Sequence, residues 1–206
     1  MNEKGEWDHS TYPTTTDVQN EIWRNGIISN SFEPGSTGKV LTYAAAIEEG
    51  LITEDTQFDD THGYLDIGRT MVKCHNYAIG GCGIIDAKEA VAQSCNVAFM
   101  EIGKLLGPEL FAKYQQLHNF GQRTGIDLPG ETTGIVYGDR MTTIDAACNS
   151  FGQTINVNMM QMMAAYCSII NGGMLYQPHI VKRIESANGE VVKEYKANLV
   201  RQTITA

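Results

Sequence analysis

The chain has 206 residues, 42% of them hydrophobic and 19% charged, which is enough for one domain with a buried core and excludes a disordered chain. Its formal net charge is −9, and its lysines and arginines form no stripe, so we expect no nucleic-acid partner. The polar N-terminus contains no signal peptide, and no stretch approaches the ~20 apolar residues of a membrane span. We therefore expect this chain to be soluble and without an anchor.

The N-terminal half begins with a polar segment over residues 1–30, which we expect to be extended, residues 1–23 forming a leader. A turn at 33–35 then opens a helix over 36–49, closed by Gly50. The apolar residues of that helix recur at helical spacing, which predicts that it faces a core. Residues 53–83 are rich in glycine and predict loops with short strands.

The second half predicts more helix. Pro108 is placed to open one helix, and the glycine- and proline-rich segment 121–138 predicts a loop. Residues 180–195 predict a β-hairpin around an Asn-Gly turn. The expected helices are 87–93 (capped by Asp86), 97–106, 108–118, 142–147 and 157–171.

Five cysteines are an odd number, and they include no Cys-x-x-Cys pair, so a disulfide framework is not predicted. Cys74, His75 and Cys82 are conceivable metal ligands, but their spacing fits no common zinc motif. A Cys74–Cys82 disulfide is the better interpretation of that pair. We expect the other three to be buried free thiols and expect no metal or cofactor: Cys95, Cys148 and Cys167.

The segment Ser36-Thr37-Gly38-Lys39 places a lysine three residues after a serine, near an expected helix start. Side chains three apart share a helix face, at ~5–6 Å between Cβ atoms, so the amine can contact the hydroxyl. Burial lowers the pKa of an amine, and the helix N-terminus favours a developing alkoxide, so Lys39 can serve as a base for Ser36. On spacing alone, an N-cap serine with a solvated lysine is the simpler interpretation.

Ser94-Cys95-Asn96 lies at an expected break between two helices. A serine and an amide two residues apart on a tight connection can both point into one cleft, where the hydroxyl relays a proton and the amide holds a carbonyl. Simple capping by Asn96 is the alternative. A similar triplet, Ser186-Ala187-Asn188, precedes Gly189 and is interpreted only as part of a hairpin turn.

The sequence around these two motifs resembles one family, the class B penicillin-binding proteins, which are the cell-division and sporulation transpeptidases. The resemblance covers residues 24–195, and its motifs occur in the family's order. They are the nucleophile segment SNSFEPGSTGKV, the second motif AVAQSCNVAFMEIG, the loop TGIDLPGE, the helix NSFGQTINVNMMQMMAAYCSIINGG and the tail MLYQPHIVKRI.

This resemblance implies a serine D,D-transpeptidase that works on peptidoglycan. Ser36 would be the acylated nucleophile, Lys39 its base and Ser94 a proton relay, while Asn96 would bind the substrate amide. The implied partners are the D-Ala-D-Ala stem peptide, β-lactams as covalent inhibitors and proteins of cell-wall synthesis. The parent protein would work outside the cytoplasmic membrane, tethered by an anchor that this chain lacks.

The family's third motif, Lys-Thr-Gly, does not occur in the chain. The nearest match, Arg123-Thr124-Gly125, belongs to the TGIDLPGE loop. We therefore expect residues 1–206 to form one C-terminally truncated domain. The implied fold is the α+β, two-lobe β-lactamase/transpeptidase arrangement, with its helical lobe largely present and its antiparallel sheet lobe incomplete.

Two alternatives remain open at this point. The missing motif favours a catalytically inactive, penicillin-recognising scaffold or sensor. A serine β-lactamase would share the first motif, but no deacylating glutamate can be assigned, and the loop and helix segments favour the transpeptidase.

Overall fold

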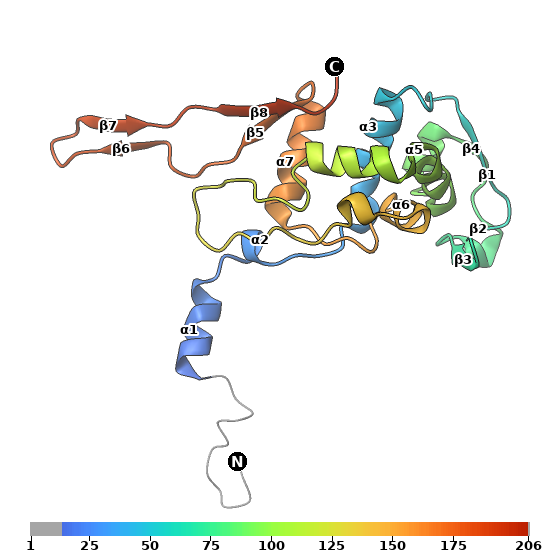
Figure 1. The fold of residues 1–206 in the computed structure, drawn as a ribbon, viewed down its shortest axis with the longest axis horizontal. Coiled ribbons are helices and arrows are strands. Elements are labelled where there is room, and N and C mark those ends of the chain that lie inside the picture. The colour runs from blue at the N-terminus through green and yellow to red at the C-terminus, as the bar shows by residue number, and fades with distance from the viewer. Residues whose placement is uncertain (1–13, 206) are drawn as a thin grey trace, which may run out of the picture.

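The computed structural model describes residues 14–205, and helices form most of its core (Figure 1). The helices are α1 (Thr15–Trp23), α2 (Gly26–Ser29), η1 (Gly35–Gly38), α3 (Lys39–Glu48), η2 (Tyr77–Ile79), α4 (Ala87–Ala92), α5 (Asn96–Leu117), η3 (Gly138–Arg140), α6 (Thr143–Asn149) and α7 (Met159–Ile170). The strands are β1 (Gln57–Asp60), β2 (Tyr64–Ile67), β3 (Thr70–Lys73), β4 (Gly83–Asp86), β5 (Met174–Gln177), β6 (Arg183–Glu185), β7 (Val191–Glu194) and β8 (Asn198–Gln202).

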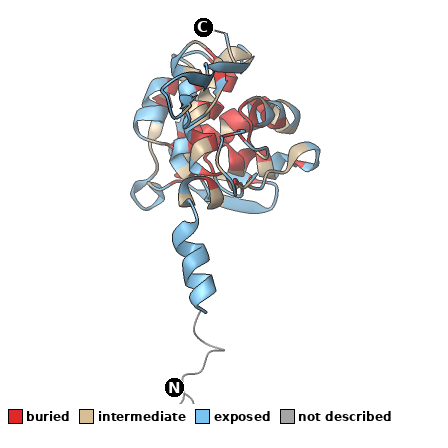
Figure 2. Ribbon diagram, turned by 90° about the vertical axis from the view of Figure 1, so that its left-hand side faces the viewer, coloured by how far each residue is buried: buried red, intermediate tan, exposed pale blue. Residues whose placement is uncertain are grey.

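Helix α5 is the centre of the core, and it packs against α3 and α6. Its first half is buried on several faces, through Val97, Phe99, Met100 and Ile102. Gly107 has non-helical angles (φ 70°, ψ 170°) just before the proline and kinks the helix, so the two helices predicted from the sequence are two segments of α5. Figure 2 shows the buried residues concentrated in these central helices.

The strands form four separate antiparallel pairs: β1 with β4, β2 with β3, β5 with β8 and β6 with β7. The predicted hairpin over 180–195 is confirmed as β6 and β7, whose turn contains Gly189 at φ 84°. Both strands are exposed, and the hairpin projects from the helical body (Figure 1). The pairs β1–β4 and β2–β3 lie at the opposite end of the molecule.

The prediction of an extended segment over 1–30 is wrong for the part that the structure describes. Helix α1 begins because the Thr14 hydroxyl accepts the N–H of Asp17, while the Asp17 carboxylate accepts the N–H of Thr14. Helix α2 follows with Asn25 as its cap. The rest of the expected leader, residues 1–13, lies outside the described residues.

Similar capping boxes start α4, α6 and α7, which is why the sequence located these helices well. Asp86 caps α4, as predicted, with Glu89 as its reciprocal partner. At α7 the box pairs Asn158 with Gln161, both fully buried. Within residues 14–205, no helix combines the length and the apolar character needed to cross a bilayer.

Candidate active site

Ser36 lies in the tight 3-10 turn η1, immediately before α3, and its side chain is exposed. The predicted α-helix over 36–49 is therefore corrected at its start, since regular α-helix begins only at Lys39. The segment just after α6 holds this turn in place: the Gly35 N–H donates to the Gly152 carbonyl at 2.9 Å. Gly152 has φ 79°, and a Cβ there would lie 2.0 Å from the Gly35 oxygen, so only glycine permits this approach.

Lys39 is buried, with 4% of its surface exposed, and its amine is bonded to the second motif. Nζ donates to the Ser94 carbonyl at 2.6 Å, to Ser94 Oγ at 2.9 Å and to Asn96 Oδ1 at 2.7 Å. The Phe99 ring lies below it, with its centroid 5.2 Å from Nζ. Burial lowers the pKa of Lys39 to about 8, against a smaller opposing effect of nearby cysteines. A neutral amine is therefore accessible near physiological pH.

Ser94 joins the two motifs. It occupies the sharp connection between α4 and α5 in the left-handed region (φ 54°), a conformation that is uncommon for a residue with a side chain. Its Oγ donates to Ser36 Oγ at 2.9 Å. Among the described residues, Lys39 forms no hydrogen bond to Ser36, so the contact expected from their spacing is made through Ser94 instead.

Asn96 is the first residue of α5, with Cys95 as the cap. Its Oδ1 accepts from Lys39, which fixes the amide plane, and its NH₂ group forms no hydrogen bond with another described residue. A half-buried amide held in this way can donate to a carbonyl placed over Ser36. The structure thus brings together all four site residues predicted from the sequence: Ser36, Lys39, Ser94 and Asn96.

The segment 149–173 supports the nucleophile turn from the other side. The Thr42 hydroxyl donates to the Ser150 carbonyl at 2.9 Å, which ties α3 to the end of α6. The Tyr166 hydroxyl of α7 donates to the Thr37 carbonyl at 2.6 Å. Sequence spacing gave no signal for these contacts, because each joins residues more than 100 positions apart.

The TGIDLPGE loop is organised by a buried carboxylate. Glu131 accepts the N–H and the hydroxyl of Thr124 at 2.8 and 2.6 Å, and it accepts the N–H of Gly125 at 3.2 Å. Arg123-Thr124-Gly125 therefore belongs to a loop closed by Glu131, as the sequence context indicated. The second Ser-x-Asn triplet forms a hairpin turn, in which Ser186 bonds to Asn188 and to Glu190.

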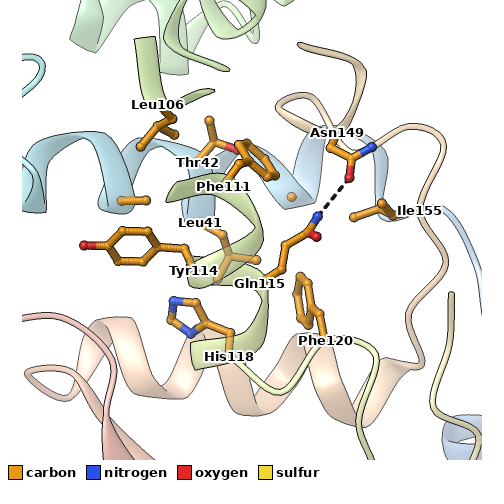
Figure 3. A pocket seen from close by; sticks show the side chains of 12 residues that line it. Leu41, Thr42, Leu106, Phe111, Tyr114, Gln115, His118, Phe120, Asn149 and Ile155 are labelled. Atoms are coloured by element: carbon orange, nitrogen blue, oxygen red, sulfur yellow. Dashed lines mark hydrogen bonds between the residues drawn. The ribbon is translucent and has the colours of Figure 1, made fainter. Parts of the chain in front are cut away.

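A small cavity of about 30 Å³ lies behind α3, and Figure 3 shows its walls. Leu41 and Thr42 line it from α3, while Gln115 and His118 line it from the α5 side. Gln115 donates to Asn149 at 2.9 Å, but its Oε1 has no partner among the described residues. Since Ser36 does not line this cavity, we assign it to the core rather than to a substrate.

The described cysteines are all free, so the disulfide favoured for Cys74 and Cys82 is not formed. Cys95 is buried as expected, and Cys148 is partly buried. Cys167 is exposed, which corrects the expectation that it is a buried thiol. Cys167 lies on α7, where buried and exposed positions alternate. Methionine and alanine occur on both faces of this helix, so the sequence did not indicate which face is exposed to solvent.

Comparison with known proteins identifies the family of the chain. The family model described as "Penicillin binding protein transpeptidase domain" matches residues 4–206. Stage V sporulation protein D of Bacillus subtilis is 38% identical over 88% of the chain and 28% of its own length. Penicillin-binding protein PbpB of Mycolicibacterium smegmatis is 29% identical over 93% of the chain and 30% of its own length. The chain thus spans less than a third of the length of these relatives.

Solved structures give the same result for the fold. Penicillin binding protein 3 from Mycobacterium tuberculosis superposes with a TM-score of 0.78 at 27% identity, covering 88% of this chain and 40% of that one. A peptidoglycan synthetase from Bifidobacterium adolescentis gives 0.80 at 26% identity, covering 91% and 34%. The predicted α+β transpeptidase fold is confirmed, and a serine β-lactamase is not favoured.

Proposed function

The chain belongs to the family of penicillin-binding protein transpeptidase domains, and from this premise we propose that it carries the acyl-serine chemistry of a peptidoglycan D,D-transpeptidase. One observation carries the proposal most directly. Ser36, Ser94 and Lys39 form a continuous hydrogen-bonded chain from an exposed hydroxyl to a buried amine. This is the arrangement that activates a serine without a histidine.

In the acylation step, Ser36 is the nucleophile. Its Oγ attacks the carbonyl of the penultimate D-alanine, and its proton passes through Ser94 Oγ to neutral Lys39. The carbonyl oxygen gains the negative charge, and we expect the backbone N–H of Ser36 to donate to it. When the C–N bond breaks, the proton returns through Ser94 to the departing amine, and an ester remains on Ser36.

Asn96 is proposed to orient the stem peptide, because its amide is fixed by Lys39 and faces the same site. In the second step, the amine of another stem attacks the ester carbonyl and Ser36 Oγ leaves, recovering a proton through the same relay. A β-lactam imitates the dipeptide and acylates the same serine. Structures of the Mycobacterium tuberculosis relative in complex with aztreonam and ampicillin support this inhibitor class.

The parent protein is proposed to work on the outer face of the cytoplasmic membrane, where peptidoglycan is assembled, with cell-wall synthesis proteins as partners. The sporulation and penicillin-binding names of the relatives support this setting. A penicillin-recognising scaffold is the second candidate function. Whether penicillin acylates Ser36 separates this candidate from the transpeptidase.

The test is intact-mass spectrometry of the chain after incubation with a fluorescent penicillin. We expect one adduct per chain, absent in Ser36→Ala and strongly slowed in Ser94→Ala. The matched control is Ser186→Ala, which changes the serine of the other Ser-x-Asn triplet and is expected to acylate normally.

A wild-type chain that is folded by circular dichroism but forms no adduct would contradict transpeptidase chemistry in this chain and favour the scaffold. Rapid release of hydrolysed drug, with no lasting adduct, would instead identify a β-lactamase.

A further inference from the structure

A second cluster of reactive side chains lies directly behind the active-site triplet. We call it the cysteine–aspartate cluster, and it contains Asp60, Cys74, Cys82 and Cys95. One ligand atom from each residue lies within 4.8 Å of all the others. The four residues come from four segments: the end of β1, the loop after β3, the turn before β4 and the N-cap of α5.

The cluster has the dimensions of a tetrahedral metal site. With Zn–S bonds of ~2.3 Å and a Zn–O bond of ~2.0 Å, neighbouring ligand atoms are separated by roughly 3.5–3.8 Å. Cys95 Sγ lies 3.2 Å from Asp60 Oδ2, so only small movements separate the observed arrangement from a coordinated one. Three thiols and one carboxylate are ligands that suit zinc.

Asp60 supplies an independent indication. Its side chain is 1% exposed, and Oδ1 has no hydrogen-bond partner among the described residues. A buried carboxylate oxygen without a partner is costly, and a cation is the group that most readily offsets the cost. The backbone packs tightly around Asp60, because a Cβ on Gly81 would lie 1.8 Å from the Asp60 carbonyl oxygen.

The sulfur atoms are also surrounded by donors. The Asn96 N–H points at Cys74 Sγ at 3.3 Å, and the Ala98 N–H points at Cys95 Sγ at 3.4 Å. The Asn76 side-chain amide donates to Cys82 Sγ at 3.4 Å. An N–H donor beside each sulfur favours its thiolate form. Thiolate metal sites need hydrogen-bond donors of this kind around their ligands.

We propose that the cysteine–aspartate cluster binds one structural Zn²⁺ ion. Binding forms three Zn–S bonds and one Zn–O bond, and it releases the three thiol protons to solvent. All four positions are taken by the protein, and three of the four residues are buried, so the ion is structural and does not itself catalyse. It fastens Cys95 between Ser94 and Asn96 and thereby fixes the backbone of the second motif.

This inference revises the sequence-based expectation that the chain has no metal. That expectation considered Cys74 and Cys82 with His75, whose Nδ1 instead contacts Cys74 Sγ at 3.5 Å from outside the cluster. The missing ligands, Asp60 and Cys95, come from a strand end and from the triplet itself. No short-range spacing motif joins them.

The test is metal analysis of the chain, purified under reducing conditions without a metal-affinity step. Inductively coupled plasma and native mass spectrometry are expected to find one zinc per chain. Cys82→Ser and Asp60→Asn are expected to lose it, while the matched controls Cys148→Ser and Cys167→Ser are expected to keep it. Both controls remove a cysteine outside the cluster.

Cobalt gives a readout that does not depend on recovering zinc from the host. Adding Co²⁺ to the reduced, chelator-treated wild-type chain is expected to produce intense visible bands of a tetrahedral site and a near-ultraviolet thiolate band. Cys167→Ser should show the same spectrum and Cys82→Ser should lose it.

Three results would overturn the proposal. The first is a folded, reduced wild-type chain that takes up neither zinc nor cobalt. The second is a folded Cys82→Ser or Asp60→Asn variant with full zinc content. The third is a wild-type chain isolated without metal, in which two of the cluster cysteines are joined by a disulfide.

Discussion

The serine–lysine site and the cysteine–aspartate cluster divide three consecutive residues, 94–96, between them, yet the two groups lie in different environments. Ser94 and Asn96 face Lys39, beside the exposed hydroxyl of Ser36. Cys95, between them, is fully buried against Asp60. Ser94, at the start of this triplet, has left-handed backbone angles (φ 54°). A single strained turn therefore serves a site that must meet substrate and a cluster that holds the turn in place.

The largest difference between the two regions is expected on removing the lysine. Lys39→Met deletes the proposed base while keeping an unbranched, buried side chain. We expect penicillin acylation to slow by about 10²–10⁴-fold, the usual contribution of a general base. Stopped-flow acylation measures this effect, and Lys104→Met, on the exposed face of α5, is the control. An unchanged rate in folded Lys39→Met would remove Lys39 from the mechanism.

The pH dependence of acylation tests the same proposed role of Lys39 as the base. Burial lowers the pKa of Lys39 to about 8, and the neutral amine is the reactive form. The rate should therefore rise with pH, by about tenfold per unit below pH 8, and should level off above it. A series of single-turnover rates from pH 6 to 10 tests this. A rise that continues to pH 10 without levelling off would show that the reactive group does not have the lowered pKa of buried Lys39.

The cysteine–aspartate cluster can be broken without touching the serine–lysine site. Gly81→Ala places a Cβ against the Asp60 backbone at a residue with φ 79°. We expect it to lower the free energy of unfolding by about 3 kcal/mol, because backbone must move. Its neighbour Gly80 also has positive φ but nothing within 4 Å, so Gly80→Ala should cost only about 1 kcal/mol. Equal losses in urea denaturation would mean that strain alone, and not the contact with Asp60, decides the effect.

A smaller effect than that of Gly81→Ala is expected in the core, at the C-cap of α5. Burial, with a smaller contribution from Arg201, lowers the pKa of His118 to about 4. The folded state holds this group neutral, so the stabilisation is complete above the unfolded pKa of about 6.5 and is lost as pH falls towards 4. Between pH 7 and 5, His118 should account for a loss of about 2 kcal/mol.

Urea denaturation at several pH values checks the role of His118. The wild-type chain is compared with His118→Gln, which has no imidazole and should lose less stability in acid. If both proteins lose stability equally between pH 7 and 5, His118 is not responsible for the acid sensitivity.

Much of the helical framework could be predicted, because its signals are local. The caps at Asp86 and Asn158 start helices through bonds to residues only three positions away. The glycine and proline after Leu106 marked the kink in α5. Prediction failed over 14–30, where the capping box of Thr14 and Asp17 was overlooked in a polar segment, and at η1, where the tighter turn depends on Gly152 from far along the chain.

By itself, the sequence predicted the four candidate active-site residues, because two short motifs in a fixed order carry them. Only the tertiary structure decided how they connect, placing Ser94 between Ser36 and Lys39 and burying the amine so that its pKa falls. Only the fold also brought Asp60 to the three cysteines. Hydrogen bonding, burial and metal-ligand geometry all depend on distances between residues far apart in the chain, and sequence spacing does not record those distances.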